Sequence, residues 1–490
     1  MLFTTAVFAC LFLPLVLAGF FAAARFSHSA AASWLFAASL FFYGYWMPEF
    51  TLLLIASICG NFFIGTRIGR TSRTNAKRWL ATGITTNLIL LAYFKYANFF
   101  VDNLNVAIGV NWNIGRVLLP IGISFFTFTQ IAFLADAFQK GVREYKFTHY
   151  GLFVTYFPHL IAGPVLHHAQ MMPQFSDART YRWNSAHVAG GLAIFALGMF
   201  KKVVLADGIS PYADAVFKPA DAGLMPDFHE AWLGALAYTF QIYFDFSGYS
   251  DMAVGLSWLF NVRLPFNFNS PYRAANISDF WRRWHMSLSN FLRDYLYIAL
   301  GGNRLGPVRR YANLATTMLL GGLWHGANWT FVLWGGLHGL YLVLNHAFRA
   351  WCGETRLARL GASRTFSVFT WALTMLAVIV AWVFFRAETF AGAWHILRGM
   401  AGANRAETEH VLLWNAGLQL STGAWWCLAL GTVAFLAPNS NHIGTRLLDL
   451  CRNNTKVRSW VGGAALTAAF SLVLVNTARD SVSAFIYFNF

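Results

Sequence analysis

The sequence predicts an all-α, polytopic membrane protein, and three observations lead to this fold class. Hydrophobic residues make up 57% of the 490 residues and charged residues only 11%, whereas a soluble chain has about 25% charged residues. The mean hydropathy is +0.48, and the apolar residues gather in long runs. Aromatic residues reach 18%, which is enough for belts at both membrane surfaces. We therefore expect one integral-membrane domain over residues 1–490, a bundle of about a dozen transmembrane and re-entrant helices.

The apolar runs set the order of the expected helices. A helix needs ~20 apolar residues to cross a bilayer, and several runs are shorter, so we expect re-entrant segments among the crossings. No positive charge precedes the first run, so we interpret it as a membrane helix rather than a cleaved signal peptide. The runs cover residues 2–24, 31–47, 50–66, 79–94, 117–135, 150–166, 187–205, 231–260, 311–345 (two passes), 366–385, 424–437 and 462–476.

The positive charges predict the orientation of the chain. The net charge is +16, with basic residues gathered in loops 67–78, 140–146, 201–202 and 263–310. The positive-inside rule places such loops in the cytoplasm. Because three crossings precede the first basic loop, we expect the N-terminus in the periplasm. This distribution explains the charge better than nucleic-acid binding does, and it would attract an anionic donor to the cytoplasmic side.

Missing motifs exclude several classes of soluble enzyme. The sequence contains no GxGxxG, Walker A loop, GxSxG elbow or HExxH. A hydrolase-type acyl-enzyme and an ATP-driven pump are therefore disfavoured. The five cysteines are dispersed and form no CxxC pair, so neither a disulfide framework nor a zinc site is indicated, and no metal is predicted.

Residues 279–300 are predicted to form one helix. Trp284, Leu288 and Phe291 recur at helical spacing and make an apolar stripe. A second face carries Arg282, His285, Ser289 and Arg293. The helix is too polar to cross lipid easily, so we expect it at the membrane surface or enclosed by protein. A glycine loop with a basic end follows over residues 298–304.

Residues 311–345 contain no Lys, Arg, Asp or Glu and are too long for one straight crossing of ~20 residues. We expect a break near residues 326–328, close to His325. An ionisable side chain at membrane depth is a candidate functional group. His325 fits a general base, with Trp324 and Asn328 as nearby polar donors. The alternative is a neutral histidine bonded to a neighbouring helix.

Other polar groups in apolar runs receive mostly structural interpretations. His285 is a candidate second functional histidine, although spacing alone slightly favours an interfacial residue. His338 is expected to be structural. Asp245 and Asp251 lie in an apolar run and need partners. We expect them to pair with arginines of residues 282–293, and orienting a histidine is the alternative.

These segments resemble the membrane-bound O-acyltransferase (MBOAT) family. The similarity is carried by residues 279–289, 292–298, 300–304 and 323–326, and further by residues 93–99, 119–125, 157–164, 243–251 and 485–490. Within the family, the chain is similar to the bacterial proteins that O-acetylate alginate. The motifs are less specific for the acceptor, because peptidoglycan O-acetyltransferases and D-alanyl transfer proteins share them.

The resemblance implies a helical bundle that encloses a tunnel across the bacterial inner membrane. The histidine matching His325 is then catalytic, and the one matching His285 is also needed for activity. Acetyl-CoA is the implied cytoplasmic donor, and a periplasmic acetyltransferase partner passes acetyl to a polysaccharide. The residues predicted to bind the donor are Arg282, Arg283, Ser289, Arg293, Asn303 and Arg304.

Two functions from different classes follow. The first is O-acetylation of an alginate-like exopolysaccharide, with peptidoglycan or another cell-wall polymer as the alternative acceptor. The second is a proton-coupled transporter in which His325 relays protons. Paired gapped helices in two halves would favour transport. The sequence shows no such repeat, and the arginine-rich segment before His325 favours the enzyme.

Overall fold

The computed structural model describes residues 1–144, 146–160, 163–361, 363–404, 410–478 and 485–486. Every regular element in these residues is a helix, which confirms the all-α prediction. Residues 161–162 and 487–490 of the segments that carry the family resemblance lie outside the described residues.

The chain divides into two compact units. Unit 1 comprises Met1–Met199, Gly248–Phe266 and Ser440–Asn489, and unit 2 comprises Phe200–Ser247, Asn267–Asn439 and Phe490. The long helix α12 (Phe228–Leu259) belongs to both. The single domain predicted over residues 1–490 stays a prediction beside this division.

Among the described residues, unit 1 contains a series of helical elements besides residues 248–259 of α12. They are η1 (Val7–Phe12), α1 (Leu13–Ala24), α2 (His28–Gly44), α3 (Pro48–Arg70), α4 (Arg73–Leu91), η2 (Ala92–Tyr96), α5 (Ala97–Ile108), α6 (Ile123–Gln139), α7 (Phe147–Thr155), α8 (Phe157–Leu160), α9 (His168–Ser176), η3 (Ala178–Tyr181), α21 (Ser440–Asn453) and α22 (Thr455–Thr477). Helix α10 (Ser185–Phe200) also lies in this unit except for its last residue.

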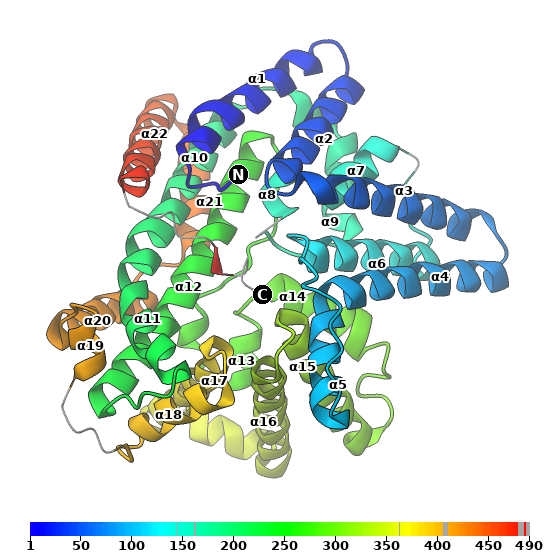
Figure 1. Cartoon of the computed structure of the whole chain (residues 1–490). Coiled ribbons are helices and arrows are strands. Elements are labelled where there is room, and N and C mark those ends of the chain that lie inside the picture. The colour runs from blue at the N-terminus through cyan, green and yellow to red at the C-terminus, as the bar shows by residue number, and fades with distance from the viewer. Residues whose placement is uncertain (145, 161–162, 362, 405–409, 479–484, 487–490) are drawn as a thin grey trace. The chain divides into compact units, whose positions relative to one another are not determined.

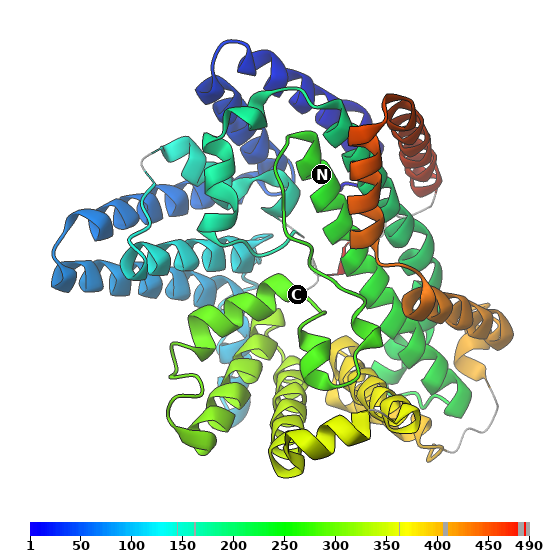
Figure 2. The same ribbon diagram turned by 180° about the vertical axis from the view of Figure 1, so that it is seen from behind.

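Helices α3, α4 and α6 lie side by side in unit 1 (Figures 1 and 2). Asn61 of α3 and Asn87 of α4 are both buried, and Nδ2 of Asn87 donates to Oδ1 of Asn61 at 2.6 Å. Such an amide pair satisfies polar groups that lipid cannot. Gly65 allows the close approach of α6, because a Cβ there would collide with the ring of Phe133.

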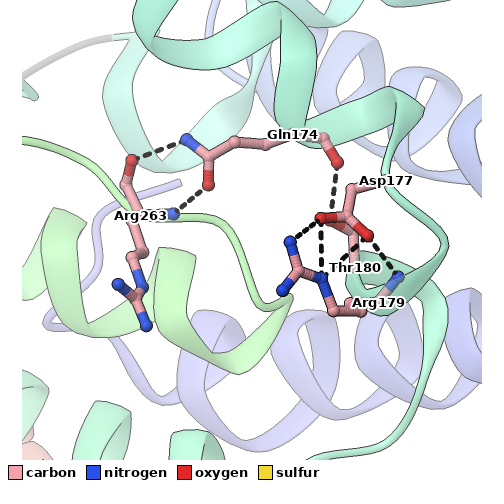
Figure 3. Close-up of polar contacts among 5 residues, drawn as sticks. All are labelled: Gln174, Asp177, Arg179, Thr180 and Arg263. Atoms are coloured by element: carbon pink, nitrogen blue, oxygen red, sulfur yellow. Dashed lines mark hydrogen bonds and ion pairs between the residues drawn. The ribbon is translucent and has the colours of Figure 1, made fainter.

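A polar connection ties the end of α12 to the α9–η3 region in unit 1 (Figure 3). Nε2 of Gln174 donates to the Arg263 carbonyl at 2.9 Å, and the Arg263 N–H donates to Oε1 of Gln174 at 2.8 Å. The Thr180 hydroxyl donates to the Gln174 carbonyl at 2.6 Å. Asp177 caps η3, and its hydrogen bonds with the Arg179 guanidinium lower the pKa of its carboxyl. One side chain therefore fixes two chain segments that are far apart in sequence.

Unit 2 holds the stretch that the sequence marks as functional. Its elements are η4 (Lys201–Ala206), α11 (Asp207–Asp221), η5 (Pro271–Arg273), α13 (Ile277–Trp281), α14 (Met286–Phe291), η6 (Leu292–Tyr297), α15 (Gly306–His325), α16 (Trp329–Gly361, kinked at Gly353), α17 (Arg364–Arg386), α18 (Phe390–Met400), α19 (Val411–Asn415) and α20 (Leu420–Leu436), with the first part of α12.

The membrane character is confirmed by the helices themselves. Among the described residues, six helical segments are long and apolar enough to cross a membrane, and a seventh if α20 and α21 are counted together. Their apolar side chains face outward; Leu52 of α3, for example, is 76% exposed. Such a surface requires lipid rather than water around it. These six or seven segments are fewer than the expected dozen crossings, because several apolar runs form helices too short to span a membrane.

The predicted break in residues 311–345 is confirmed. Helix α15 ends at His325 and α16 begins at Trp329, and the two helices pack side by side. Gly322 and Gly335 face each other at this contact, where an added Cβ on either would collide with the other helix. The hairpin therefore depends on small residues at its crossing, as membrane helix pairs commonly do.

The single helix predicted over residues 279–300 is wrong. The chain forms α13, turns at residues 282–285, and continues as α14 and the π-helix η6. The turn is held by a segment distant in sequence, since the Asn269 N–H donates to the Arg283 carbonyl and the Met286 N–H to the Asn267 carbonyl, both at 2.9 Å. Of the apolar stripe, Trp284, Leu288 and Phe291 are buried as expected.

Candidate active site

His325 is the last residue of α15, with only 3% of its surface exposed. The backbone is extended at Gly326 and turns into α16. Asn328 holds this turn, because its Nδ2 donates to the Glu388 carbonyl at 2.9 Å and its Oδ1 accepts from the Thr330 N–H at 3.1 Å. The structure thus gives Asn328 a part in the turn that follows His325, and its expected role as a polar donor near the base stays a prediction.

Three aromatic rings surround the imidazole of His325. Its centroid lies 4.9 Å from that of Trp324, 5.0 Å from Trp334 and 5.3 Å from Phe385, each in an edge-to-face arrangement. Such walls keep water away and strengthen electrostatic interactions inside. The C-terminal end of a helix favours positive charge. The end of α15 therefore offsets part of the cost that burial among aromatic rings places on a positive charge at this imidazole.

His285 is fully buried at the start of α14. Its backbone is left-handed (φ 42°, ψ 54°), which is uncommon for a residue with a side chain. Its Nδ1 lies 3.2 Å from Oδ1 of Asn267, and its ring packs edge-to-face on Phe246 at 4.6 Å. His285 does not share the polar face predicted for it, because the turn before it breaks the helical register.

Trp324 joins the two histidines into one cluster. Its ring centroid lies 4.9 Å from that of His325 and 6.5 Å from that of His285. Trp324 is itself buried. The structure therefore brings together the two histidines that the sequence singled out, although they are forty residues apart in the chain.

The contacts of His338 give it a structural role. It is fully buried, and its Nδ1 accepts a hydrogen bond from Nε1 of Trp281 at 3.3 Å. Its ring stacks on Phe280 with an interplanar angle of 9°. This arrangement agrees with the structural role predicted for His338.

A cavity of about 320 Å³ in unit 2 gathers four of the six predicted donor-binding residues. Arg282, Ser289, Arg293 and Asn303 line it. Its wall reaches the histidine cluster through Trp281, whose ring centroid is 5.9 Å from that of Trp334. The cavity combines guanidinium groups, hydroxyls and aromatic rings, which suits an anionic ligand with a flat ring system.

Arg283 and Arg304, the other two predicted donor-binding residues, are not among the residues lining this cavity. Arg283 instead pairs with Asp279 at 2.9 Å and donates to the Asn269 carbonyl. Arg304 is exposed in the glycine loop.

Sequence reasoning missed several of the lining residues, among them a contacting pair of basic side chains. Arg310 and His346 lie on α15 and α16, and Nη2 of Arg310 is 3.1 Å from Nδ1 of His346. Arg310 is the last residue of the basic loop 263–310, so its charge could have suggested a role in donor binding. No local sequence feature distinguishes His346.

The buried carboxylate of Asp245 has a lysine as its partner, not an arginine of residues 282–293. Nζ of Lys202 lies 2.6 Å from Oδ1 of Asp245 and 2.7 Å from Oδ1 of Asp207, and all three side chains are buried. The prediction of an arginine partner for Asp245 is therefore wrong. Asp251 is buried in the same helix, α12.

Asp227, His229 and His410 form a cluster of possible metal ligands, with one atom of each within 4.8 Å of the others. The Asp227 carboxylate already accepts from the Glu230 N–H and from both the N–H and the ring of His410. Burial works against ionisation, but these hydrogen bonds outweigh it and lower the pKa of Asp227. The cluster is explained as a cap at the start of α12, and a metal would have to break its bonds.

Comparison with known proteins shows that the sequence is similar to acyl-transferring membrane proteins. The sequence profile of the MBOAT, membrane-bound O-acyltransferase, family matches residues 133–387, which include both histidines and the cavity. A peptidoglycan O-acetyltransferase of Helicobacter pylori is 37% identical over 100% of this chain and 98% of its own length. A probable alginate O-acetylase of Azotobacter vinelandii is 45% identical over 82% of this chain and 78% of its own. Its counterpart in Pseudomonas aeruginosa is 42% identical over 86% and 79%.

Proposed function

The chain belongs to the membrane-bound O-acyltransferase family, and we propose that it transfers acetyl groups from acetyl-CoA for O-acetylation of a polymer outside the cytoplasm. It is an acyltransferase embedded in a membrane. The observation that carries the proposal is His325, buried among aromatic rings at the C-terminal end of α15 within the matched region.

His325 acts as the general base in this reaction. The oxygen of an acceptor hydroxyl attacks the thioester carbonyl carbon, and its proton passes to the imidazole of His325. The tetrahedral intermediate then collapses, the carbon–sulfur bond breaks, and the proton returns from the imidazolium to the leaving thiolate. The C-terminal end of α15 stabilises the imidazolium while it exists. His285 assists from the same cluster through its contact with Trp324.

The cavity lined by Arg282, Arg293 and Arg310 receives the donor. Coenzyme A carries phosphates and an adenine ring, and guanidinium groups bind phosphate through paired hydrogen bonds. Trp281 and Tyr297 line the same cavity and offer rings for stacking. The basic loops around this region support a cytoplasmic entrance, by the positive-inside rule.

The final acceptor, reached through a partner protein, is a polysaccharide, with an alginate-like exopolysaccharide as the first candidate and peptidoglycan as the second. The alginate O-acetylases have the higher identity, whereas the peptidoglycan O-acetyltransferase matches the whole chain. In both cases a periplasmic partner protein receives the acetyl group, and the chain lies in the inner membrane.

The test compares a deletion strain with its complemented parent. Acetyl content is measured separately in the secreted polysaccharide and in the purified peptidoglycan of each strain. In a second assay, labelled acetyl-CoA is supplied to membrane vesicles and its consumption is measured. Loss of acetyl from one polymer alone identifies the acceptor. Unchanged acetyl content in both polymers, or labelled acetyl-CoA left unconsumed with the partner present, would refute the proposal.

A further inference from the structure

One amide oxygen holds the start of α14. Oδ1 of Asn267 lies 3.2 Å from the backbone N of Ser287, 2.8 Å from Oγ of Ser287 and 3.2 Å from Nδ1 of His285. Asn267 is 1% exposed, His285 0% and Ser287 6%. All three residues belong to unit 2.

The backbone N–H of Ser287 settles which end of the Asn267 amide faces His285. An N–H group can only donate, so the atom in front of it is the amide oxygen and not the NH₂. The same oxygen faces Nδ1 of His285. Nδ1 must therefore carry a hydrogen, and in a neutral imidazole the lone pair then lies on Nε2.

The surrounding backbone fixes the imidazole in this position. The Met286 N–H donates to the Asn267 carbonyl at 2.9 Å, so residue 267 binds the His285 ring with its side chain and the next residue with its main chain. The left-handed backbone of His285 is the kind of strained conformation that persists only where neighbouring contacts over-determine it. The ring also rests edge-to-face on Phe246. The left-handed backbone, the contacts with Asn267 and the packing on Phe246 therefore all restrict the His285 side chain.

We propose that Asn267 is a positioning residue for acetyl transfer, which keeps His285 in its Nδ1–H tautomer and so leaves the ring lone pair on Nε2. This inference rests on the proposed function, since it assumes that His285 takes part in the reaction. Histidines commonly have their tautomer set by the hydrogen bond at the other ring nitrogen. Here that bond comes from a residue in a loop, eighteen positions earlier.

The test combines kinetics with a direct reading of the tautomer. Asn267→Ala is expected to lower kcat for acetyl-CoA consumption by about tenfold or more, with KM for acetyl-CoA within about twofold. Asn267→Asp restores an acceptor for Nδ1–H and should recover most of the lost rate. Asn476→Ala is the matched control, because Asn476 is an equally buried asparagine whose Nδ2 donates to the Thr4 carbonyl in unit 1.

Nuclear magnetic resonance of protein labelled with isotopic nitrogen at histidine gives the second reading, and His285→Ala assigns the signals. We expect a protonated Nδ1 and an unprotonated Nε2 in the wild type, and loss of this preference in Asn267→Ala. An Nε2–H tautomer in the wild type would overturn the inference.

The kinetic results separate the inference from the function on which it rests. Wild-type kcat in Asn267→Ala beside a lowered kcat in His285→Ala would overturn the positioning role alone. Full activity in His285→Ala would remove His285 from the proposed mechanism and the positioning role with it. An equal loss in Asn267→Ala and Asn476→Ala would show general destabilisation and refute the role of Asn267.

Discussion

Replacing His325 with alanine tests the proposed base, and the structure sets the size of the expected effect. A general base contributes 10²–10⁴-fold, or roughly 3–5 kcal/mol of barrier. Because His325 is buried among Trp324, Trp334 and Phe385, water has little room to replace its imidazole in the variant. We therefore expect His325→Ala to abolish polymer acetylation while the protein still inserts and folds. The assay is acetyl content of the polymer, normalised to folded protein in the membrane.

His338→Ala is the internal control, because His338 is as deeply buried and lies on the next helix. Truncation there removes the long hydrogen bond from Trp281 and the stacking on Phe280. The hydrogen bond is worth ~1 kcal/mol, and the lost packing adds to it, so the effect should appear as lower abundance or melting temperature. Acetylation per folded molecule should remain close to wild type. His285→Ala should fall between the two.

Two outcomes would refute this reasoning. Wild-type acetylation by His325→Ala would mean that the reaction needs no base at this position. Equal losses per folded molecule in His325→Ala and His338→Ala would mean that burial within the aromatic cluster, not proton transfer, explains the sensitivity.

Three further predictions concern topology, donor binding and stability. Reporter fusions at Arg73 and Arg304 should both read cytoplasmic, and a periplasmic signal at either would overturn the orientation. Arg310→Ala should raise KM for acetyl-CoA about tenfold through a lost charge-assisted hydrogen bond. Arg309→Ala, at the exposed neighbouring position, is the control. Equal KM values in the two variants would remove Arg310 from the donor site. Lys202→Met should destabilise the protein by about 3–5 kcal/mol, since two buried carboxylates lose an ion pair with the ammonium group. An unchanged melting temperature would contradict this.

The sequence predicted the elements whose signals are local. Residues 311–345 are too long and too apolar for one crossing, and the break falls at Gly326-Ala327-Asn328, as expected from length and composition. The family resemblance was also confirmed, because its motifs are contiguous in sequence. His325 was singled out as a candidate for the same reason, since an ionisable residue in an uncharged run is visible without knowing the fold.

The failures of prediction have one physical cause, which is pairing between segments distant in sequence. The apolar stripe of residues 279–300 has an unbroken helical period, yet backbone hydrogen bonds from residues 267–269 break the helix at residues 282–285. Lys202 pairs with Asp245 across forty-three positions, and Arg310 meets His346 across thirty-six. Local helix propensity does not indicate any of these contacts, because they form only when the tertiary structure brings the two segments together.

Both candidate histidines lie at helix ends, and this placement has a chemical consequence. The direction of a side chain inside a helix follows from the helix. The direction of His285 is instead set by its left-handed backbone and its contact with the Asn267 amide, and that of His325 by the turn at residues 326–328. Trp324 lies against both rings, so a shift of either helix end changes the distance between the two imidazoles. Because proton transfer requires hydrogen-bond distances, the turns that break the two helices set the geometry of the reaction. The residues that hold those turns, Asn267 and Asn328, should therefore influence rate without touching either substrate.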